Sequence, residues 1–221
     1  MDHLLYVEFC FRAGVAFAEA DDALDELNDR LVYGNNWVLL STTSAITGAA
    51  YPHKLAYLWD TEQQGATLDP SDSHHGAAFQ KVVELCEAVT ISPLQPHKYS
   101  PKTRPEPYPP PPKSNSVNHY FLVAKLTAKT GMRDALVNQS ADMLNVIAGK
   151  VRWKLLASGT YGERSVLNFW RLDDGSALLD GLRAFEEEPS YAEVLRVSAR
   201  HEQDIHTSIR DNPLGSNPDL H

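Results

Sequence analysis

Hydrophobic residues recur along this chain with two periods. An apolar run at residues 4–11 is short enough for a strand, and apolar residues three and four positions apart at 17–31 predict a helix that stops at Gly34. Two further runs, Trp37-Val-Leu-Leu-Ser and Tyr57-Leu-Trp59-Asp, then predict a hairpin. A helical stripe at 79–86 and a short strand at 88–91 complete this first pattern.

The same order of elements occurs again in the second half. A strand opens at His119-Tyr-Phe-Leu-Val-Ala-Lys, and a helical pattern follows at 136–147. Trp153-Lys-Leu-Leu-Ala and Asn168-Phe-Trp170-Arg then repeat the hairpin strands. The two tryptophans are 22 residues apart in the first half and 17 in the second, which a longer hairpin loop in the first half explains. The chain therefore reads as a duplicated unit.

The end of the second half is predicted to be helical. Apolar positions at 178–185 mark one helix. The capping box Ser190-Tyr-Ala-Glu193 opens a second, which we expect to continue as a long helix to Ile209.

Nine of the fourteen prolines fall within residues 93–112. Proline fixes φ and removes a donor, so we expect an extended polyproline spacer there. The predicted organisation is a first unit at 1–93, a linker at 94–117, a second unit at 118–211 and a flexible tail at 212–221. Two such units can bury their bare sheet faces against each other. The predicted fold class is thus α+β, with two tandem ferredoxin-like units forming an intramolecular dimeric α+β barrel.

Composition excludes some partners. The formal net charge of -9 disfavours nucleic acid and anionic membrane surfaces, which attract basic proteins. We find no leader and no apolar stretch near the roughly 20 residues of a membrane span. Cys10 and Cys86 lie in apolar surroundings, which is typical of reduced core thiols. These features predict a cytoplasmic protein.

The duplicated pattern resembles the dimeric α+β barrel superfamily, and within it NIPSNAP-like domains. The resemblance rests on Tyr120 to Gly131, on Asn168-Phe-Trp170-Arg-Leu-Asp and on Glu187-Glu-Pro-Ser-Tyr191. It implies one of several activities, including cofactor-free monooxygenases, polyketide cyclases, isomerases, dehydratases and haem proteins. NIPSNAP-like domains often have a histidine two residues before the tryptophan, where this chain has Tyr57 and Asn168.

Alternation along the strands suggests where chemistry could occur. The mixed polar and aromatic faces are expected in a cavity between the two sheets, with Leu167 and Phe169 packing on helices. As catalytic candidates we take His53 for acid–base work, Tyr57 for proton donation and Asn168 for holding an oxygen. The substrate-binding candidates are Trp59, Trp170, His119, Arg164 and Arg171. Each has a plain structural alternative, such as an exposed hairpin position for His53 or a core aromatic for Tyr57.

No metal site is predicted. His201-Glu-Gln-Asp-Ile-His206 resembles a zincin motif, but its histidines are five residues apart rather than four. Our leading hypothesis is a cofactor-independent enzyme that acts on a planar or polyunsaturated small molecule by cyclisation, isomerisation, dehydration or oxygenation, as in natural-product biosynthesis. One alternative is a non-catalytic binding or scaffolding protein that forms a homodimer through sheet edges. The other is a haem protein with His53 or His119 as the axial ligand.

Overall fold

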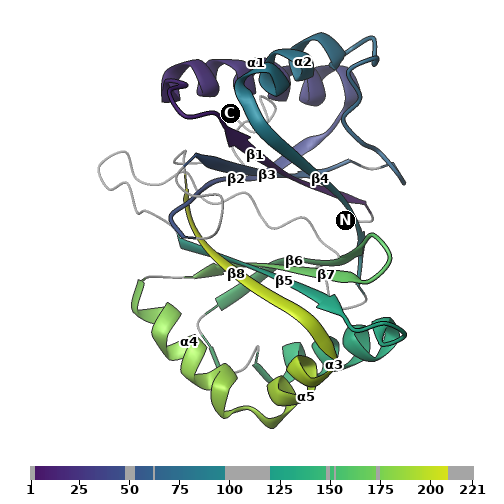
Figure 1. Ribbon diagram of the computed structural model, residues 1–221, viewed down its shortest axis with the longest axis vertical. Coiled ribbons are helices and arrows are strands. Elements are labelled where there is room, and N and C mark those ends of the chain that lie inside the picture. The colour runs from purple at the N-terminus through teal and green to yellow at the C-terminus, as the bar shows by residue number, and fades with distance from the viewer. Residues whose placement is uncertain are drawn as a thin grey trace. The chain divides into compact units, whose positions relative to one another are not determined.

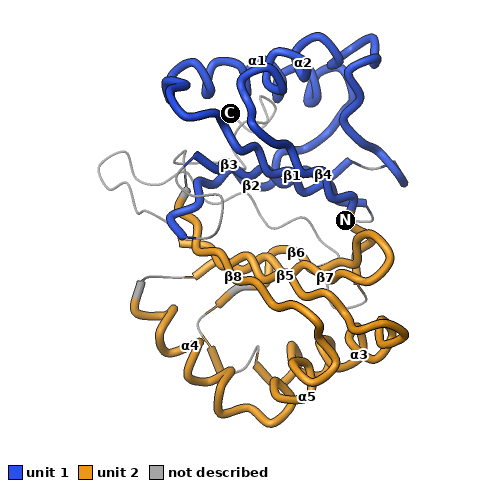
Figure 2. Tube along the Cα trace, viewed as in Figure 1, with its two compact units in different colours: residues 1–93, 106–117, 208–221 blue, residues 94–105, 118–207 orange. Residues whose placement is uncertain are grey.

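The computed structural model divides the chain into two compact units (Figure 2). We call the described residues up to Pro93 unit 1, and those from Leu94 to Thr207 unit 2. The structure describes residues 3–47, 53–61, 63–97, 120–147, 150–151, 153–172 and 175–208. Most of the predicted linker, the predicted tail and His119 lie outside the described residues.

Unit 1 is a four-stranded sheet covered on one face by two helices (Figure 1). The strands lie in the order β4-β1-β3-β2, and β3 pairs antiparallel with both β1 and β2. This is the ferredoxin-like arrangement. Its elements are β1 (Leu4–Phe11), α1 (Phe17–Asn35), β2 (Val38–Ala45), β3 (Lys54–Asp60), α2 (Gly76–Leu85) and β4 (Cys86–Pro96).

The core of unit 1 lies between the sheet and these helices. One face of β1 and β3 contributes alternate residues, among them Phe9, Tyr57 and Trp59, and α1 contributes Leu24 and Leu27. Residues two apart on a strand point to the same side, so the alternation of β3 places its aromatic residues on the helix-covered face. Burying this stripe is what holds α1 against the sheet.

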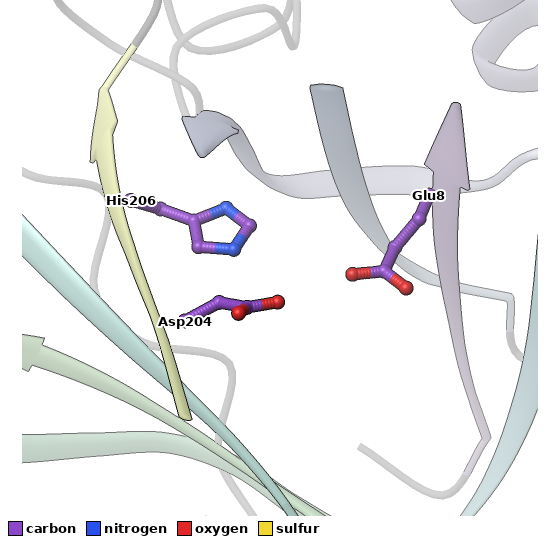
Figure 3. A group of neighbouring side chains, drawn as sticks. All are labelled: Glu8, Asp204 and His206. Carbon is purple, nitrogen blue, oxygen red and sulfur yellow. The ribbon is translucent and has the colours of Figure 1, made fainter. Parts of the chain in front are cut away.

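The opposite face of unit 1 carries a buried ion pair. Glu8, which projects from β1 (Figure 3), lies opposite Ala56 of β3. Its Oε1 accepts a hydrogen bond from the Tyr6 hydroxyl at 3.1 Å and lies 3.2 Å from the Lys54 ammonium nitrogen. Only 5% of the Lys54 side chain and 7% of the Glu8 side chain are exposed, so each charge compensates for the desolvation of the other.

Unit 2 repeats the arrangement with the strand order β8-β5-β7-β6 and three helices on one face (Figure 1). The last residues of β4 also join this sheet, because Gln95 and Pro96 pair with Thr160 and Gly159. The elements of unit 2 are β5 (Tyr120–Ala128), α3 (Arg133–Ile147), β6 (Trp153–Tyr161), β7 (Ser165–Leu172), α4 (Gly175–Glu187), α5 (Pro189–Val197) and β8 (Ser198–Ser208). The predicted fold class, α+β with two tandem ferredoxin-like units, is therefore confirmed.

The predicted long helix at the end of unit 2 is wrong. Helix α5 ends at Val197, and the next eleven residues form strand β8, which pairs antiparallel with β5 from Ser198 to Thr207. The capping box does not form either, since Glu188 is the N-cap residue and the Ser190 hydroxyl donates to its carboxylate. A ladder of hydrogen bonds to β5 outweighs the weak helical pattern of this polar segment.

Strand β4 is longer than predicted and contains prolines. It runs through Pro93 to Pro96, although the prediction ended the strand at Ile91. Proline cannot donate to the ladder, but its carbonyl can still accept. The residue paired with Pro96 on β6 is Gly159, and a Cβ added there would lie 2.9 Å from the Gln95 carbonyl oxygen. The glycine thus permits the close approach of the two backbones.

Among the described residues, no helix is both long and apolar enough to cross a membrane.

Candidate functional site

The prediction of which strand faces pack on helices is wrong. The mixed polar and aromatic faces of β3 and β7 lie toward the helices of their units. Asn168 and Trp170 lie on the helix-covered face of unit 2, where Trp170 belongs to the same core cluster as Phe185 of α4 and Val194 of α5. Tyr57 and Trp59 likewise lie on the helix-covered face of unit 1. Both faces of β3 and β7 are rich in apolar residues, so hydrophobicity alone does not tell which face the helices cover.

In unit 1 the helix-covered interior is filled by aromatic rings. Tyr57 stacks on Trp59 with ring centroids 5.1 Å apart and meets Phe9 edge-on at 5.9 Å. Trp59 packs against Trp37 at 6.2 Å, and its ring N–H donates to Asn28 of α1 at 3.1 Å. All of these rings are almost completely buried. This packing matches the structural alternative for Trp59 and Tyr57, a buried aromatic core.

Unit 2 has a small internal pocket at the corresponding place. It lies between the sheet and the helices and measures about 20 Å³, which is room for about one water molecule. Its lining combines apolar and polar side chains. The lining residues are Leu122, Ala124, Leu126, Met143, Asn168, Trp170, Phe185, Tyr191, His201 and Gln203. Two residues of the predicted site, Asn168 and Trp170, therefore meet in one cavity.

Asn168 is the buried polar residue of this pocket. It is only 2% exposed, and its Oδ1 accepts a hydrogen bond of 2.7 Å from the Ser158 hydroxyl on the neighbouring strand β6. Ser158 and Asn168 are directly paired in the register, so the serine fixes the orientation of the amide. With the amide oxygen engaged, the N–H groups of Asn168 are the donors left for an oxygen atom in the pocket.

Tyr191 and His201 form the polar end of the pocket. The Tyr191 hydroxyl lies 3.3 Å from Nδ1 of His201, and both side chains are partly buried. Burial lowers the pKa of His201, so its imidazole is neutral near pH 7. Burial, helped by the charge of Glu186, raises the pKa of the Tyr191 hydroxyl. Neither residue was a predicted site residue, because the segment containing His201 was expected to be helical.

A continuous run of aromatic rings forms the wall behind this pair. Trp153 meets Trp170 at 5.9 Å, and Phe185 meets Trp153 at 5.2 Å and Trp170 at 6.3 Å. Phe185 then meets Tyr191 edge-on at 5.6 Å, and Tyr191 meets the His201 ring at 5.8 Å. The wall is fixed at its inner end, where the Trp153 ring N–H donates to the Ala177 carbonyl at 2.6 Å.

The remaining predicted site residues that the structure describes do not line this pocket. His53 is exposed just before β3 in unit 1, and its carbonyl accepts from the Phe11 amide. Arg164 is exposed in the turn between β6 and β7 and donates to the Thr130 hydroxyl at 3.2 Å. Arg171 is partly buried. It lies on the other face of β7 from Trp170, because successive side chains of a strand point to opposite faces. None of these three residues therefore joins Asn168 and Trp170 in the internal pocket of unit 2.

Three polar residues, Arg171, Asp204 and His206, lie on the face of the unit 2 sheet away from its helices. The sequence pattern did not indicate this group. Phe121 lies opposite Arg171 on β7 and opposite His206 on β8, and it stacks on Phe169 at 5.5 Å. His206 is fully buried, and Figure 3 shows the side chains of Asp204 and His206 on the same side of β8. Once β8 is recognised as a strand, alternation separates these two residues from His201.

Two wider hollows occur on the surface of the described residues. One, of about 380 Å³, lies in unit 2 beside His97, Arg133 and Thr160. The other, of about 680 Å³, lies in unit 1 beside Asp29 and Tyr33. They are larger than the internal pocket, but they are open to solvent and include none of the predicted site residues. The internal pocket has the enclosure and the converging polar groups that a small-molecule site needs.

The fold is shared with several solved structures. The putative monooxygenase of Fusobacterium nucleatum is 9% identical, with a TM-score of 0.63 over 94% of this chain and 92% of its own. The putative monooxygenase of Lactobacillus acidophilus is 11% identical, with a TM-score of 0.59 over 96% and 95%. An anthrone oxidase-like protein is 10% identical, with a TM-score of 0.55 over 95% and 92%.

The expected resemblance to the dimeric α+β barrel superfamily is confirmed as a likeness of fold. No protein-family model matches the sequence, and none of the curated proteins does. At these identities the likeness describes the fold, which many activities share.

Proposed function

We propose that this chain is a cofactor-independent enzyme that oxygenates a planar aromatic small molecule in the internal pocket of unit 2. The observation that carries this proposal is the buried amide of Asn168, which Ser158 orients beside the aromatic wall of the pocket. The names of the structural neighbours, two putative monooxygenases and an anthrone oxidase-like protein, support oxygenation over the other reactions of this fold.

The pocket residues divide the work between binding and charge stabilisation. The indole of Trp170 and the ring of Phe185 offer flat apolar surface for an aromatic substrate. The Asn168 N–H groups can donate to a substrate oxygen on which negative charge develops, as an oxyanion hole does. In the overall reaction a methylene carbon loses two hydrogens, and dioxygen supplies one oxygen atom to the new carbonyl and the other to water.

A substrate of this size requires the pocket to open. The cavity of about 20 Å³ accommodates a molecule no larger than water or dioxygen. Phe185 on α4 and Tyr191 on α5 close it from the helix side, and the backbone between these helices is the single residue Glu188. Displacement of these two helices would widen the pocket while the Ser158–Asn168 pair stays on the sheet.

The proposal is tested with anthrone as the probe. Oxygen uptake and anthraquinone formation are measured for the full chain and compared with autoxidation in buffer. We expect acceleration by the wild type and a loss of at least about tenfold in Asn168→Leu, which keeps the size but removes the amide. Asn145→Leu, an exposed position on α3, is the matched control and should keep the wild-type rate. Wild-type protein that takes up oxygen no faster than buffer alone would overturn the proposal.

The small size of the cavity favours a second candidate, a non-catalytic binding or scaffolding protein. This function predicts an interior filled by side chains, as in unit 1, and it predicts no turnover of anthrone. Sedimentation of the purified chain would show whether it forms the homodimer that this alternative includes.

The haem alternative now centres on His201, the histidine that lines the pocket in the part of the chain that the structure describes. Its Nε2 would be the atom that holds the haem iron, because Nδ1 faces Tyr191. A porphyrin needs a far wider opening than a tricyclic aromatic. A Soret band in the purified protein would favour this alternative, and its absence would count against it.

A further inference from the structure

Tyr191 and His201 line the internal pocket and are only partly buried. Gln203, which also lines it, is exposed two residues farther along β8. Tyr191 comes from α5 and His201 from β8, so the hydrogen bond between them links a helix to the sheet. The pair is therefore in reach of solvent on one side and of the aromatic wall on the other.

The geometry allows the pair to move a proton. In the tautomer that has its hydrogen on Nε2, the His201 Nδ1 accepts from the Tyr191 hydroxyl at 3.3 Å. The tyrosine oxygen then has a lone pair that can accept a hydrogen bond from a hydroxyl in the pocket. Because the imidazole is neutral, it can take up one proton.

Among the described residues that line the pocket, no carboxylate and no second histidine accompanies the pair. On β5 the residue opposite His201 is the apolar Leu126, and its neighbours two residues away on β8, Ala199 and Gln203, are both uncharged. On the helix side the nearest charge that acts on the pair is Glu186, which disfavours ionisation of Tyr191. Of the pocket-lining residues that the structure describes, His201 is the one whose side-chain type has an ordinary pKa close to neutrality, and burial lowers the pKa of this side chain.

We propose that the Tyr191–His201 pair accepts the proton of an acidic hydroxyl on the substrate, so that the pocket takes a phenol or an enol. This inference rests on the proposed function of the same pocket. In the step, the substrate O–H bond breaks and its electron pair stays on the oxygen. The proton passes to the Tyr191 oxygen as the tyrosine proton passes to Nδ1 of His201. The resulting oxyanion is the electron-rich form that reacts with dioxygen.

Two probes of the same shape separate binding from proton transfer. 4-Nitrophenol changes its absorbance when it ionises, and 4-nitroanisole has a methyl group in place of the proton. Each is titrated with the full chain at about pH 7, where the lowered pKa of His201 leaves its imidazole neutral and able to accept a proton. We expect the wild type to bind both probes and to raise the phenolate-to-phenol ratio of bound 4-nitrophenol at least about tenfold above that of the free probe, which is one pKa unit.

Two variants test the two members of the pair. In His201→Gln and in Tyr191→Phe we expect this ratio to return to that of the free probe, while the affinity for 4-nitroanisole stays within about threefold. Circular dichroism checks that each variant is folded. His74→Gln and Tyr33→Phe, both exposed in unit 1, are matched controls that should behave as wild type.

The outcomes distinguish this inference from the function on which it rests. Bound 4-nitrophenol that is ionised equally in wild type and both variants would overturn the role of the pair and leave the pocket as a binding site. A loss in His201→Gln alone would overturn the relay through Tyr191. If the wild type bound neither probe, both the pocket and this inference would be wrong.

Discussion

Replacing Gly181 by alanine should destabilise unit 2 by forcing Trp153 out of place. Gly181 is a buried residue in the middle of α4, and the indole of Trp153 lies against its backbone. A Cβ at this position would lie only 2.5 Å from the indole nitrogen and still closer to two ring carbons. Real Cβ atoms do not come so close to neighbouring atoms, so the indole or the helix must shift.

The magnitude follows from three effects. Overpacking a well-packed core costs about 1–3 kcal/mol. Displacing the indole also breaks its 2.6 Å hydrogen bond to the Ala177 carbonyl. A buried donor left without its partner costs about 1–3 kcal/mol. Alanine is a better helix former than glycine by about 1 kcal/mol, which offsets part of the cost. We therefore expect a net loss of about 3 kcal/mol in the free energy of unfolding.

Urea unfolding followed by tryptophan fluorescence measures this loss. Gly34→Ala is the matched control, since Gly34 also lies in a helix and its added Cβ would only touch the Cβ of His74 at 3.3 Å. We expect that control to change the stability by less than about 1 kcal/mol. In a Trp153→Leu background the Gly181 substitution should cost much less, because the clashing ring is gone. A Gly181→Ala variant as stable as the wild type would refute the placement of the indole against α4.

Two further predictions concern titrating groups in unit 1. Burial raises the pKa of the Cys86 thiol to about 12, whereas Cys10 is partly exposed. A thiol reagent at about pH 8 should therefore label Cys10 quickly and Cys86 slowly, and Cys10→Ser should abolish the fast phase of labelling. Fast labelling of native Cys10→Ser would contradict the burial of Cys86. Burial lowers the pKa of His75, and the charges of Asp72 and Asp69 oppose this effect. On acidification His75 is therefore protonated at a higher pH in the unfolded chain than in the folded chain. The urea concentration at the unfolding midpoint should therefore fall as the pH drops below about 6.5, and it should fall less in His75→Gln. An equal pH dependence in wild type and variant would count against a neutral buried His75.

Most of the fold could be predicted because periodicity reports it directly. The duplicated order of elements and the strands that contain Trp59 and Trp170 are found where the pattern placed them. Strand β8 was missed because it is polar along most of its length, and only its pairing with β5 makes it a strand. A strand that forms because of its pairing with another strand need not show a hydrophobic periodicity in its own sequence. The error also hid His201, since a residue on a strand meets different neighbours from one on a helix.

The candidate site could be predicted only in part, for a reason that lies in packing. Tyr57 and Asn168 occupy equivalent positions, two residues before a buried tryptophan, and each lies on the helix-covered face of its unit. In unit 1 the tyrosine ring fills the space and stacks on Trp59, whereas in unit 2 the smaller asparagine leaves a cavity and points to Ser158. The sequence shows that the two halves differ here, but it does not show which side chain leaves space. Asn168→Tyr should therefore fill the unit 2 pocket by the same packing that fills unit 1, and it should abolish binding of both nitroaromatic probes if the pocket is where they bind.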